Sequence, residues 1–534
     1  NRVVTSTTPT GAVTSYGYDA AVRLSSETDP DGGVTSYAYD ALGRLTSTTD
    51  ALGGQWVQEW DALWRVVATV DPTGARTTYA YNAEDTLESV TDPLGATTTY
   101  TLDAAYRTVA VTDPLGGQWA STLDPVGRVL ERTDPSGAQM AYTYDDTGRI
   151  TSVVDADGVE QSYTWDIAGN LTATVDGSGA ATTMTYDALG RPISVTDPDG
   201  ATTTQVWNTA GQVTTVIDPL EQESITTYDA IGQITSQTDR TGAESTFTYN
   251  ADGYLTKAVD ADGVATTFEV DWAGQVLSEE DNAGRAWETA YDALGRVISE
   301  TDPLGGESTY AWDAAHNLTS VSDPVGNVTS YGWDAAGRQV STTNADGIIT
   351  AYSYDAAGQL AKVIRNQQVD APDAAYVNLT TTYAYTPTGL MSSMTNPNGA
   401  TWTTQYTPGG RTASQTNPLG ATSSIAWDER GLPATQSDAD GRTATNSYTP
   451  AGQLAQTVHT APGLPERVES FIYNPVGDLV SMTDPTGTTS FTYDGEGRVL
   501  EQVQPGGTIN LTLSKAGRTT HKQLADGSQI DFTY

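Results

Sequence analysis

The stretch YDALGRLTSTTDALGGQWVQEW, residues 39–60, defines a 21-residue unit that recurs along this chain. Most copies begin with an aromatic residue followed by Asp or Asn, and from Asp19 to Asp355 this second slot recurs at every twenty-first residue. Such fixed spacing is typical of repeat proteins, in which one small structural unit is copied many times. The sequence therefore predicts a single array rather than several unrelated domains.

Each unit contains two turn-forming sequences, of which the first is most often worded Asp-Pro-x-Gly, as in Asp92-Pro93-Leu94-Gly95. Pro presets a type I turn, the Asp carboxylate accepts a hydrogen bond from the backbone two residues on, and Gly adopts a left-handed conformation without steric cost. In the regular part of the chain only Glu221 replaces that Gly. A type I turn followed by a left-handed residue is a favoured β-hairpin loop.

The second turn has the wording Asp40-Ala-Leu-Gly43-Arg44, and its Gly is kept less strictly. The residues that stand in this Gly slot in other copies are Val22, Trp64, Asp85, Tyr106 and His316. Because a β-branched side chain resists a positive φ, this variation predicts that the second turn has no strict left-handed requirement.

The segments between the turns are rich in Thr, Val and Tyr, which suit strands. Tyr37 and Tyr39 illustrate a spacing of two, which places both rings on one face. Each unit thus predicts one β-hairpin, and about 24 hairpins should join edge to edge. We expect an all-β fold of one long antiparallel sheet that spirals into a hollow shell, because a sheet of about 48 strands cannot stay flat. The abundance of Tyr, Trp and Thr predicts a single layer wetted on both faces.

The repeat divides the chain into three parts of one continuous domain. Residues 1–364 are the regular array, residues 365–378 are an inserted longer hairpin loop, and residues 379–534 continue the repeats less regularly, with a second insertion near His459. Arg2 and Tyr534 already occupy fixed slots of a repeat. We therefore also expect the chain to be an excerpt of a longer protein, with any targeting signal outside it.

Composition excludes several functional classes. The chain has 25 Lys and Arg against 67 Asp and Glu, a net charge of −42, which disfavours nucleic acid and anionic membrane surfaces as partners. It has no cysteine, so disulfides, thiol catalysis and Cys-based zinc sites are excluded. No apolar run approaches the length of a membrane helix, and we expect no membrane insertion.

The sequence offers no candidate catalytic, cofactor-binding or metal-binding residue. The three histidines, His316, His459 and His521, lie far apart and do not predict a Ser-His-Asp site. The loops Asp155-Ala-Asp157-Gly158 and Asp260-Ala-Asp262-Gly263 partly resemble calcium loops, but the remaining ligands are missing at the required spacing, so we interpret both as turn formers. We expect no enzymatic activity and no cofactor.

Two recurring side-chain types have more than one interpretation. The Arg of the Gly-Arg pair recurs beside rows of Asp, which predicts cross-strand ion pairs; its copies include Arg23, Arg44, Arg128, Arg149, Arg296 and Arg338. The stacked Tyr and Trp rings could form a platform for sugars, or they could pack one repeat against the next. Packing between repeats is the favoured interpretation.

The unit resembles the YD repeat of the rearrangement-hotspot (Rhs) proteins, which include bacterial polymorphic toxins, the C components of insecticidal toxin complexes, and animal teneurins. Residues 39–45 (YDALGRL) and 291–297 (YDALGRV) carry the resemblance, and it extends over essentially the whole chain. It implies a hollow shell of spiralling β-hairpins that, in the toxins, encloses a C-terminal toxic domain. The self-cleavage segment that ends such shells has no counterpart after residues 473–498, so no self-proteolysis is assigned.

The resemblance leads to two functional hypotheses. The first is a non-catalytic encapsulating shell segment of an Rhs-type bacterial toxin, secreted or at the cell surface, which sequesters an attached C-terminal toxin cargo inside and meets a delivery machinery. The alternative is a cell-surface or wall-associated adhesion scaffold that binds carbohydrate, with surface glycans as its partners. Neither hypothesis requires nucleic acid or insertion into a membrane.

Overall fold

The structure is a computed structural model that describes residues 2–368 and 377–534, and these residues form fifty β-strands and no helix. Every strand pairs antiparallel with the strand before it and the strand after it in the chain, from β1 (Thr5–Thr7) to β50 (Gln529–Asp531), so all fifty belong to one sheet. The predicted all-β fold with a single long antiparallel sheet is confirmed. With no helix among them, the described residues also contain none that could span a membrane.

The strand boundaries follow the 21-residue spacing of the sequence. Even-numbered strands from β2 (Val13–Tyr18) to β34 (Ile349–Tyr354) have six residues each, and each begins 21 residues after the previous one. Odd-numbered strands from β3 (Leu24–Thr28) to β33 (Gln339–Thr343) have five residues and follow the same step.

β35 (Leu360–Arg365) keeps this step and precedes the inserted loop. The strands after the loop are β36 (Leu379–Tyr385), β37 (Met391–Thr395), β38 (Thr401–Tyr406), β39 (Thr412–Thr416), β40 (Thr422–Trp427), β41 (Pro433–Ser437), β42 (Thr443–Tyr448), β43 (Leu454–Thr460), β44 (Arg467–Tyr473), β45 (Leu479–Asp484), β46 (Gly487–Tyr493), β47 (Val499–Gln504), β48 (Gly507–Leu513), β49 (Thr519–Gln523) and β50. The loop predicted at 365–378 connects β35 to β36, which pair with each other. Its central part, residues 369–376, lies outside the described residues.

Both turns of the unit are built around an Asp carboxylate. In the first, Asp92 Oδ1 accepts hydrogen bonds from the Leu94 and Ala96 amides at 2.9 and 2.8 Å, and the Gly95 amide donates to the Asp92 carbonyl. In the second, Asp40 Oδ1 accepts from the Leu42 and Arg44 amides at 2.9 and 3.0 Å. The two turns therefore have the same construction, and each closes a hairpin.

The prediction that the second turn tolerates an ordinary φ is wrong. Its fourth residue is left-handed whatever its side chain: φ is +74° at Val22, +67° at Trp64 and +71° at His316. The reason is that the amide of this residue must reach the carbonyl of the first residue while the Asp carboxylate holds the residues on both sides, as at Val22 and Asp19. The backbone pattern of the turn overrides the preference of the side chain.

We expect Val22→Gly to raise the free energy of unfolding by about 1 kcal/mol, because glycine adopts a positive φ without the Cβ clash that valine suffers. Thermal or urea unfolding of the two proteins measures the change. The reverse exchange in the same slot of the next repeat, Gly43→Val, should lower stability. An unchanged or lowered stability of Val22→Gly would contradict the strain argument.

The two faces of the sheet carry different side chains. On one face Tyr37 pairs with Thr48, which pairs with Trp56; on the other, Ala38 pairs with Ser47, which pairs with Val57. Among the described residues the buried hydrophobic side chains are only Ala68, Ala110, Ala243 and Val363, and no large side chain is fully buried. The sheet is a single layer, as predicted, and its stability comes from neighbour-to-neighbour contacts along the array.

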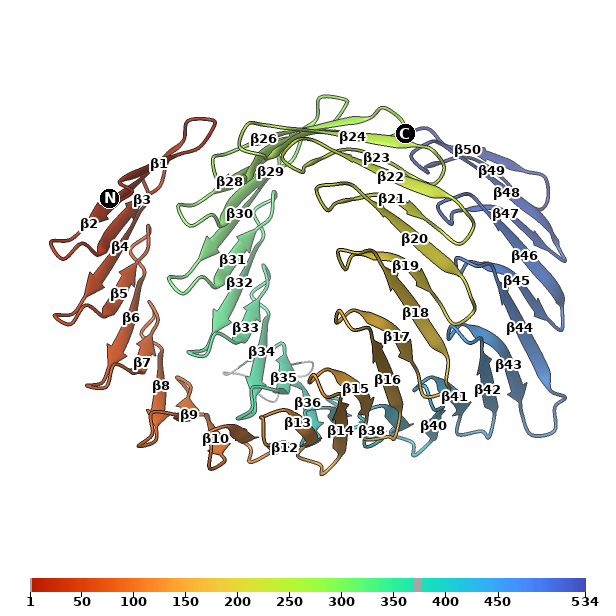
Figure 1. The fold of residues 1–534 in the computed structure, drawn as a ribbon, viewed down its shortest axis with the longest axis horizontal. Coiled ribbons are helices and arrows are strands. Elements are labelled where there is room, and N and C mark those ends of the chain that lie inside the picture. The colour runs from red at the N-terminus through yellow and green to blue at the C-terminus, as the bar shows by residue number, and fades with distance from the viewer. Residues whose placement is uncertain (1, 369–376) are drawn as a thin grey trace.

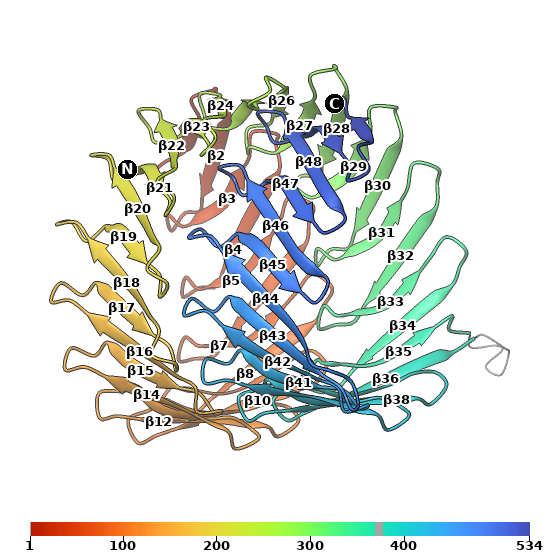
Figure 2. The same cartoon turned by 90° about the vertical axis from the view of Figure 1, so that its right-hand side faces the viewer.

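The sheet curves into two windings around a central space (Figure 1). Strands β2 to β24 form the first winding, and β26 to β50 form the second, which returns alongside it. In the perpendicular view β42 to β48 lie in front of β4 to β8, and the two sets of strands form opposite walls of this space (Figures 1 and 2). The curl follows from strand twist, because an open sheet of many strands cannot remain flat.

Candidate functional site: the stapled turns and the seam between windings

The aromatic residue that opens most units links its repeat to the preceding one. Tyr39 Oη donates to the Leu24 carbonyl at 2.9 Å, and Trp60 Nε1 donates to the Leu45 carbonyl at 2.7 Å. Tyr and Trp can fill this slot because each ring carries a polar donor at its edge. The five phenylalanines all stand two residues earlier in their repeats, where no such donor is required; they are Phe247, Phe268, Phe471, Phe491 and Phe532.

We expect Tyr228→Phe to lower the free energy of unfolding by about 1 kcal/mol, because it removes the 2.8 Å hydrogen bond to the Val213 carbonyl while keeping the ring. Urea unfolding followed by tryptophan fluorescence measures the change. The matched control is Tyr331→Phe, two residues before the corresponding slot, where the described residues supply the hydroxyl with no hydrogen-bond partner. Equal losses in the two variants would show that the donor is not what selects Tyr.

The recurring Arg joins consecutive turns along one edge of the sheet. Arg23 Nε donates to Asp19 Oδ2 at 2.7 Å within its own turn, and Nη1 donates to the Asp40 carbonyl of the next repeat at 3.2 Å. Its guanidinium lies 4.6 Å from the centroid of the Tyr39 ring, a cation–π contact. The predicted ion pairs are therefore formed, but within the turn of the Arg itself, and the link to the neighbouring repeat is made by a carbonyl and a ring.

This arrangement affects both the carboxylate and the ring. The hydrogen bonds from the Arg23 amide and then from its side chain hold the pKa of Asp19 below its ordinary value. The Tyr39 ring donates at its edge and carries the guanidinium on its face. Packing between repeats is thus the role of the ring at this slot, and a stacking surface for sugar is not left open where an Arg covers it.

Turns of the first winding contact turns of the second along a line that we call the seam. Trp272 Nε1 donates to Asp31 Oδ2 at 2.7 Å across 241 residues, and the Thr10 amide donates to Asp252 Oδ1 at 2.9 Å across 242 residues. In each pair one residue comes from the first turn type and the other from the second. At 21 residues a repeat, a winding takes roughly eleven to twelve repeats.

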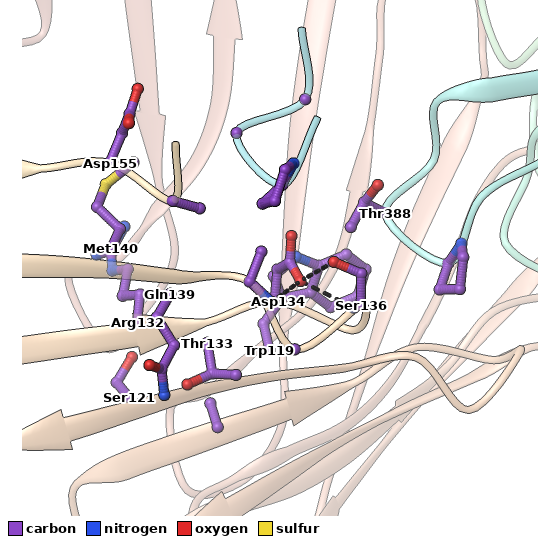
Figure 3. Close-up of a pocket in the computed structure, with 18 of the residues that line it drawn as sticks. Trp119, Ser121, Arg132, Thr133, Asp134, Ser136, Gln139, Met140, Asp155 and Thr388 are labelled. Atoms are coloured by element: carbon purple, nitrogen blue, oxygen red, sulfur yellow. Dashed lines mark hydrogen bonds between the residues drawn. The ribbon is translucent and has the colours of Figure 1, made fainter. Parts of the chain in front are cut away.

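A groove of the seam with a volume of about 1050 Å³ lies between the strands from β11 (Thr108–Thr112) to β15 (Ile150–Val154) and the turns around Thr388 and Pro408 of the second winding. Figure 3 shows Trp119, Arg132 and Met140 on the first-winding side and Thr388 on the other. The Asp134 carboxylate in the groove accepts from the Ser136 amide and hydroxyl at 2.8 and 2.6 Å. This carboxylate therefore stabilises the turn in which it lies.

The three histidines are each placed beside a different carboxylate. His316 Nε2 lies 3.6 Å from Asp50 across the seam, His459 lies 3.6 Å from Glu469, and His521 Nδ1 lies 2.7 Å from Asp531. None of these pairs joins another, and the described residues hold no group of three metal-ligating side chains. The arrangement suggests neither a catalytic triad nor a metal centre.

The seam itself is the feature that sequence reasoning missed, although a signal was present. The Pro slot of the first turn is occupied by other residues in several turns that contact the second winding, namely Ala51, Ala156, Gly177, Arg240 and Ala261. Taken one turn at a time, these replacements of Pro are indistinguishable from ordinary variation in a turn sequence. Their shared property, a neighbouring turn about 250 residues away, is visible only once the number of repeats in a winding is known.

Comparison with known proteins identifies the same architecture. A family model described as RHS Repeat matches residues 165–202, 186–223, 228–265, 272–307, 312–349, 333–368 and 473–509. A second model, described as Teneurin YD-shell, matches residues 2–164. No curated protein sequence matches the chain.

Solved structures similar to this one include complexes of TcdB2 with TccC3 and a Tc holotoxin. A crystal structure of TcdB2-TccC3-TEV has a TM-score of 0.65 and 14% identity, with 96% of this chain and 35% of that chain covered. TcdB2-TccC3-Cdc42 has a TM-score of 0.59 and 14% identity, with 96% and 34% covered. The Tc holotoxin pore of Photorhabdus luminescens has a TM-score of 0.52 and 13% identity, with 96% and 40% covered.

This chain spans about a third of the length of the first two of these structures, and at such low identity they establish a shared fold. Between them, the two family models match most of the sequence, from residue 2 to 368 with short gaps and again at 473–509. The repeat wording, the spiralling single-layer sheet and these matches agree. The chain belongs to the Rhs/YD-repeat family and is a shell-like scaffold.

Proposed function

We propose that this chain is a non-catalytic wall segment of a bacterial toxin shell, and that its role is to sequester a cargo attached to the same polypeptide. The observation that supports this most strongly is the single-layer sheet that makes two windings around a central space (Figure 1). A sheet whose repeats are linked by hydrogen bonds, and which has no packed core of its own, is suited to enclosing a separate folded domain.

The dimensions and the charge support the same proposal. A winding of roughly twenty strands spaced about 4.8 Å apart is about 30 Å across, which is comparable to the size of a folded cargo of about 130 residues, whose radius of gyration is near 14 Å. The chain carries a net charge of −42, so its field favours a basic cargo over an acidic one. The proposed cargo is a basic C-terminal toxin domain, in a protein that is secreted or exported to the cell surface. No observation favours the adhesion alternative.

Protease protection of a fused reporter tests the proposal. A basic, folded reporter domain of about 100 residues is attached after Tyr534, and its digestion is followed against that of the free reporter. We expect the fused reporter to be digested much more slowly, with protection weakened by high salt because the attraction is electrostatic. The matched control is an acidic reporter of the same size, which should be protected less. Equal digestion of fused and free basic reporter would refute sequestration.

A further inference from the structure

The two loops that partly resemble calcium loops both hold an arginine from the other winding. Arg411 Nη2 lies 2.5 Å from Asp155 Oδ2, and its Nη1 binds Asp157. Thr407 Oγ1 and the Gly409 amide also donate to Asp157, at 2.7 and 2.8 Å. The Asp157 carboxylate therefore accepts three different donors from one turn that lies about 250 residues further along the chain.

The second loop repeats this arrangement group for group. Arg518 Nη1 lies 2.8 Å from Asp262, its Nη2 binds Asp260, and the Ser514 hydroxyl and Ala516 amide donate to Asp262 at 2.6 and 3.1 Å. We call these two sets the 157 clasp (Asp155, Asp157, Thr407, Gly409, Arg411) and the 262 clasp (Asp260, Asp262, Ser514, Ala516, Arg518). Two independent occurrences of one donor pattern argue against a chance contact.

Each clasp depends on a departure from the repeat wording. In most units the first residue of the second turn is Asp. Where an Arg stands four residues later, this Asp binds it, as Asp145 binds Arg149 at 2.7 Å. In the clasps this residue is Thr407 or Ser514, so the Arg has no carboxylate in its own turn. The hydroxyl donates across the seam, where an Asp would place a second carboxylate against Asp157 or Asp262.

The same complementarity extends to other turns of the seam. The turn that begins at Thr449 faces Asp199, which accepts from the Ala451 amide at 3.2 Å. Where the first winding has Ser178 or Thr241 in place of that Asp, the facing turns keep their Asp, at Asp428 and Asp494. Asp31 departs from this pattern, because it faces the Asp271 turn, and there Trp272 supplies the donor.

We infer that the seam is a built interface in which Asp157 and Asp262 select facing turns of the form Ser/Thr-x-x-Gly-Arg, and that the two clasps hold the windings in register. The clasps act within the wall, so the inference holds whether or not the shell carries a cargo. It also assigns the two Asp-Ala-Asp-Gly loops a ligand, a guanidinium of this chain, in place of a metal ion.

We expect the clasps to remain closed in mild acid. Burial acts to raise the pKa of Asp157, but hydrogen bonds from Thr407, Gly409 and Arg411 outweigh it and leave this pKa below its ordinary value. The pKa of Asp262 is lowered first by the Ser514 hydroxyl. The charged groups facing the two carboxylates are Asp155 with Arg411 and Asp260 with Arg518.

A carboxylate whose pKa is lowered by folding adds stability above its unfolded pKa, near 3.9, and loses it as the pH falls through the lower folded value. Small-angle X-ray scattering should therefore give the same radius of gyration at pH 7 and pH 5, and a larger one only below about pH 4. Expansion between pH 7 and pH 5 would contradict this reading of the clasps.

The decisive variant is Thr407→Asp, which restores the commonest residue of the repeat and gives Arg411 a partner in its own turn. If Thr407 were only a turn residue, the exchange would be neutral or stabilising. The clasp predicts instead that the seam opens, with amide hydrogen exchange over residues 407–411 accelerating at least about tenfold because the Gly409 amide loses its partner. The radius of gyration should rise as well.

Three further proteins complete the test. Arg411→Gln, which removes the guanidinium without adding a carboxylate, should open the same segment. Asn208→Asp places the same carboxylate in a turn whose described contacts stay within its own winding, and should leave the seam closed. Thr407→Asp with Asp157→Ser recreates the Ser178–Asp428 pairing and should restore the radius of gyration. Wild-type exchange in both Thr407→Asp and Arg411→Gln, or seam opening in Asn208→Asp, would overturn the inference.

Discussion

A proline in place of Ser236 is expected to divide the array into two separately melting blocks. Ser236 lies in the middle of β23 (Ile234–Thr238), is 8% exposed, and pairs with Thr227 on one side and Thr246 on the other. Proline removes a ladder donor and places its ring against the neighbouring strand, at a cost of ~3 kcal/mol. Because no second layer covers this position, only the contacts of the seam would still join the strands before it to the strands after it.

Differential scanning calorimetry and limited proteolysis measure this effect. We expect two transitions in place of the wild-type profile, together with new cleavage between β22 (Glu223–Tyr228) and β24 (Glu244–Tyr249). The control is Ile234→Pro in the same strand, because Pro192 and Pro433 stand naturally at the first residue of β19 and β41. If both variants melted alike, the argument from a single unsupported layer would fail.

An alanine in place of Gly177 is expected to force the two windings apart. A Cβ at Gly177 would lie 1.9 Å from the Glu429 carbonyl oxygen of the other winding, and a backbone atom cannot move aside as a flexible side chain can. The conformation of Gly177 itself is ordinary, since its φ is not positive. Overpacking of this kind costs about 1–3 kcal/mol, and here the cost falls on the contact between windings.

Small-angle X-ray scattering should show a larger radius of gyration for Gly177→Ala, and hydrogen exchange should rise on both sides of the seam near residues 177 and 429. Gly506→Ala is the matched control, because a Cβ there meets no atom within 4 Å. Wild-type scattering from Gly177→Ala would mean that the windings are not in contact at this point in solution.

The repeat unit made most of the fold predictable from the sequence. The turn residues and the Thr-, Val- and Tyr-rich strand segments predict the hairpins, because each strand pairs only with its neighbours in the chain. The side chain of Val22 alone does not predict its positive φ. The hydrogen bonds that the carbonyl and carboxylate of Asp19 accept from the Val22 and Arg23 amides determine the backbone there.

The seam could not be predicted in the same way. The contact between Asp157 and Arg411 depends on the curvature of the whole sheet, which is the sum of small twists over many strands. No local pattern reports that sum. The Asp-Ala-Asp-Gly loops are visible in the sequence, but the arginine that binds each of them lies twelve units away, and only the curvature of the sheet brings the two together.

The clasps have a consequence for how such a gene can change. Near-identical tandem copies in DNA recombine unequally, and whole units are then lost or duplicated. The sheet alone would tolerate this, because a strand needs only a neighbour on each side. Loss of one unit between Asp157 and Thr407 would instead bring the turn of Asp428 opposite Asp157, carboxylate against carboxylate. Where the windings are in contact, selection against facing carboxylates thus preserves the number of repeat units.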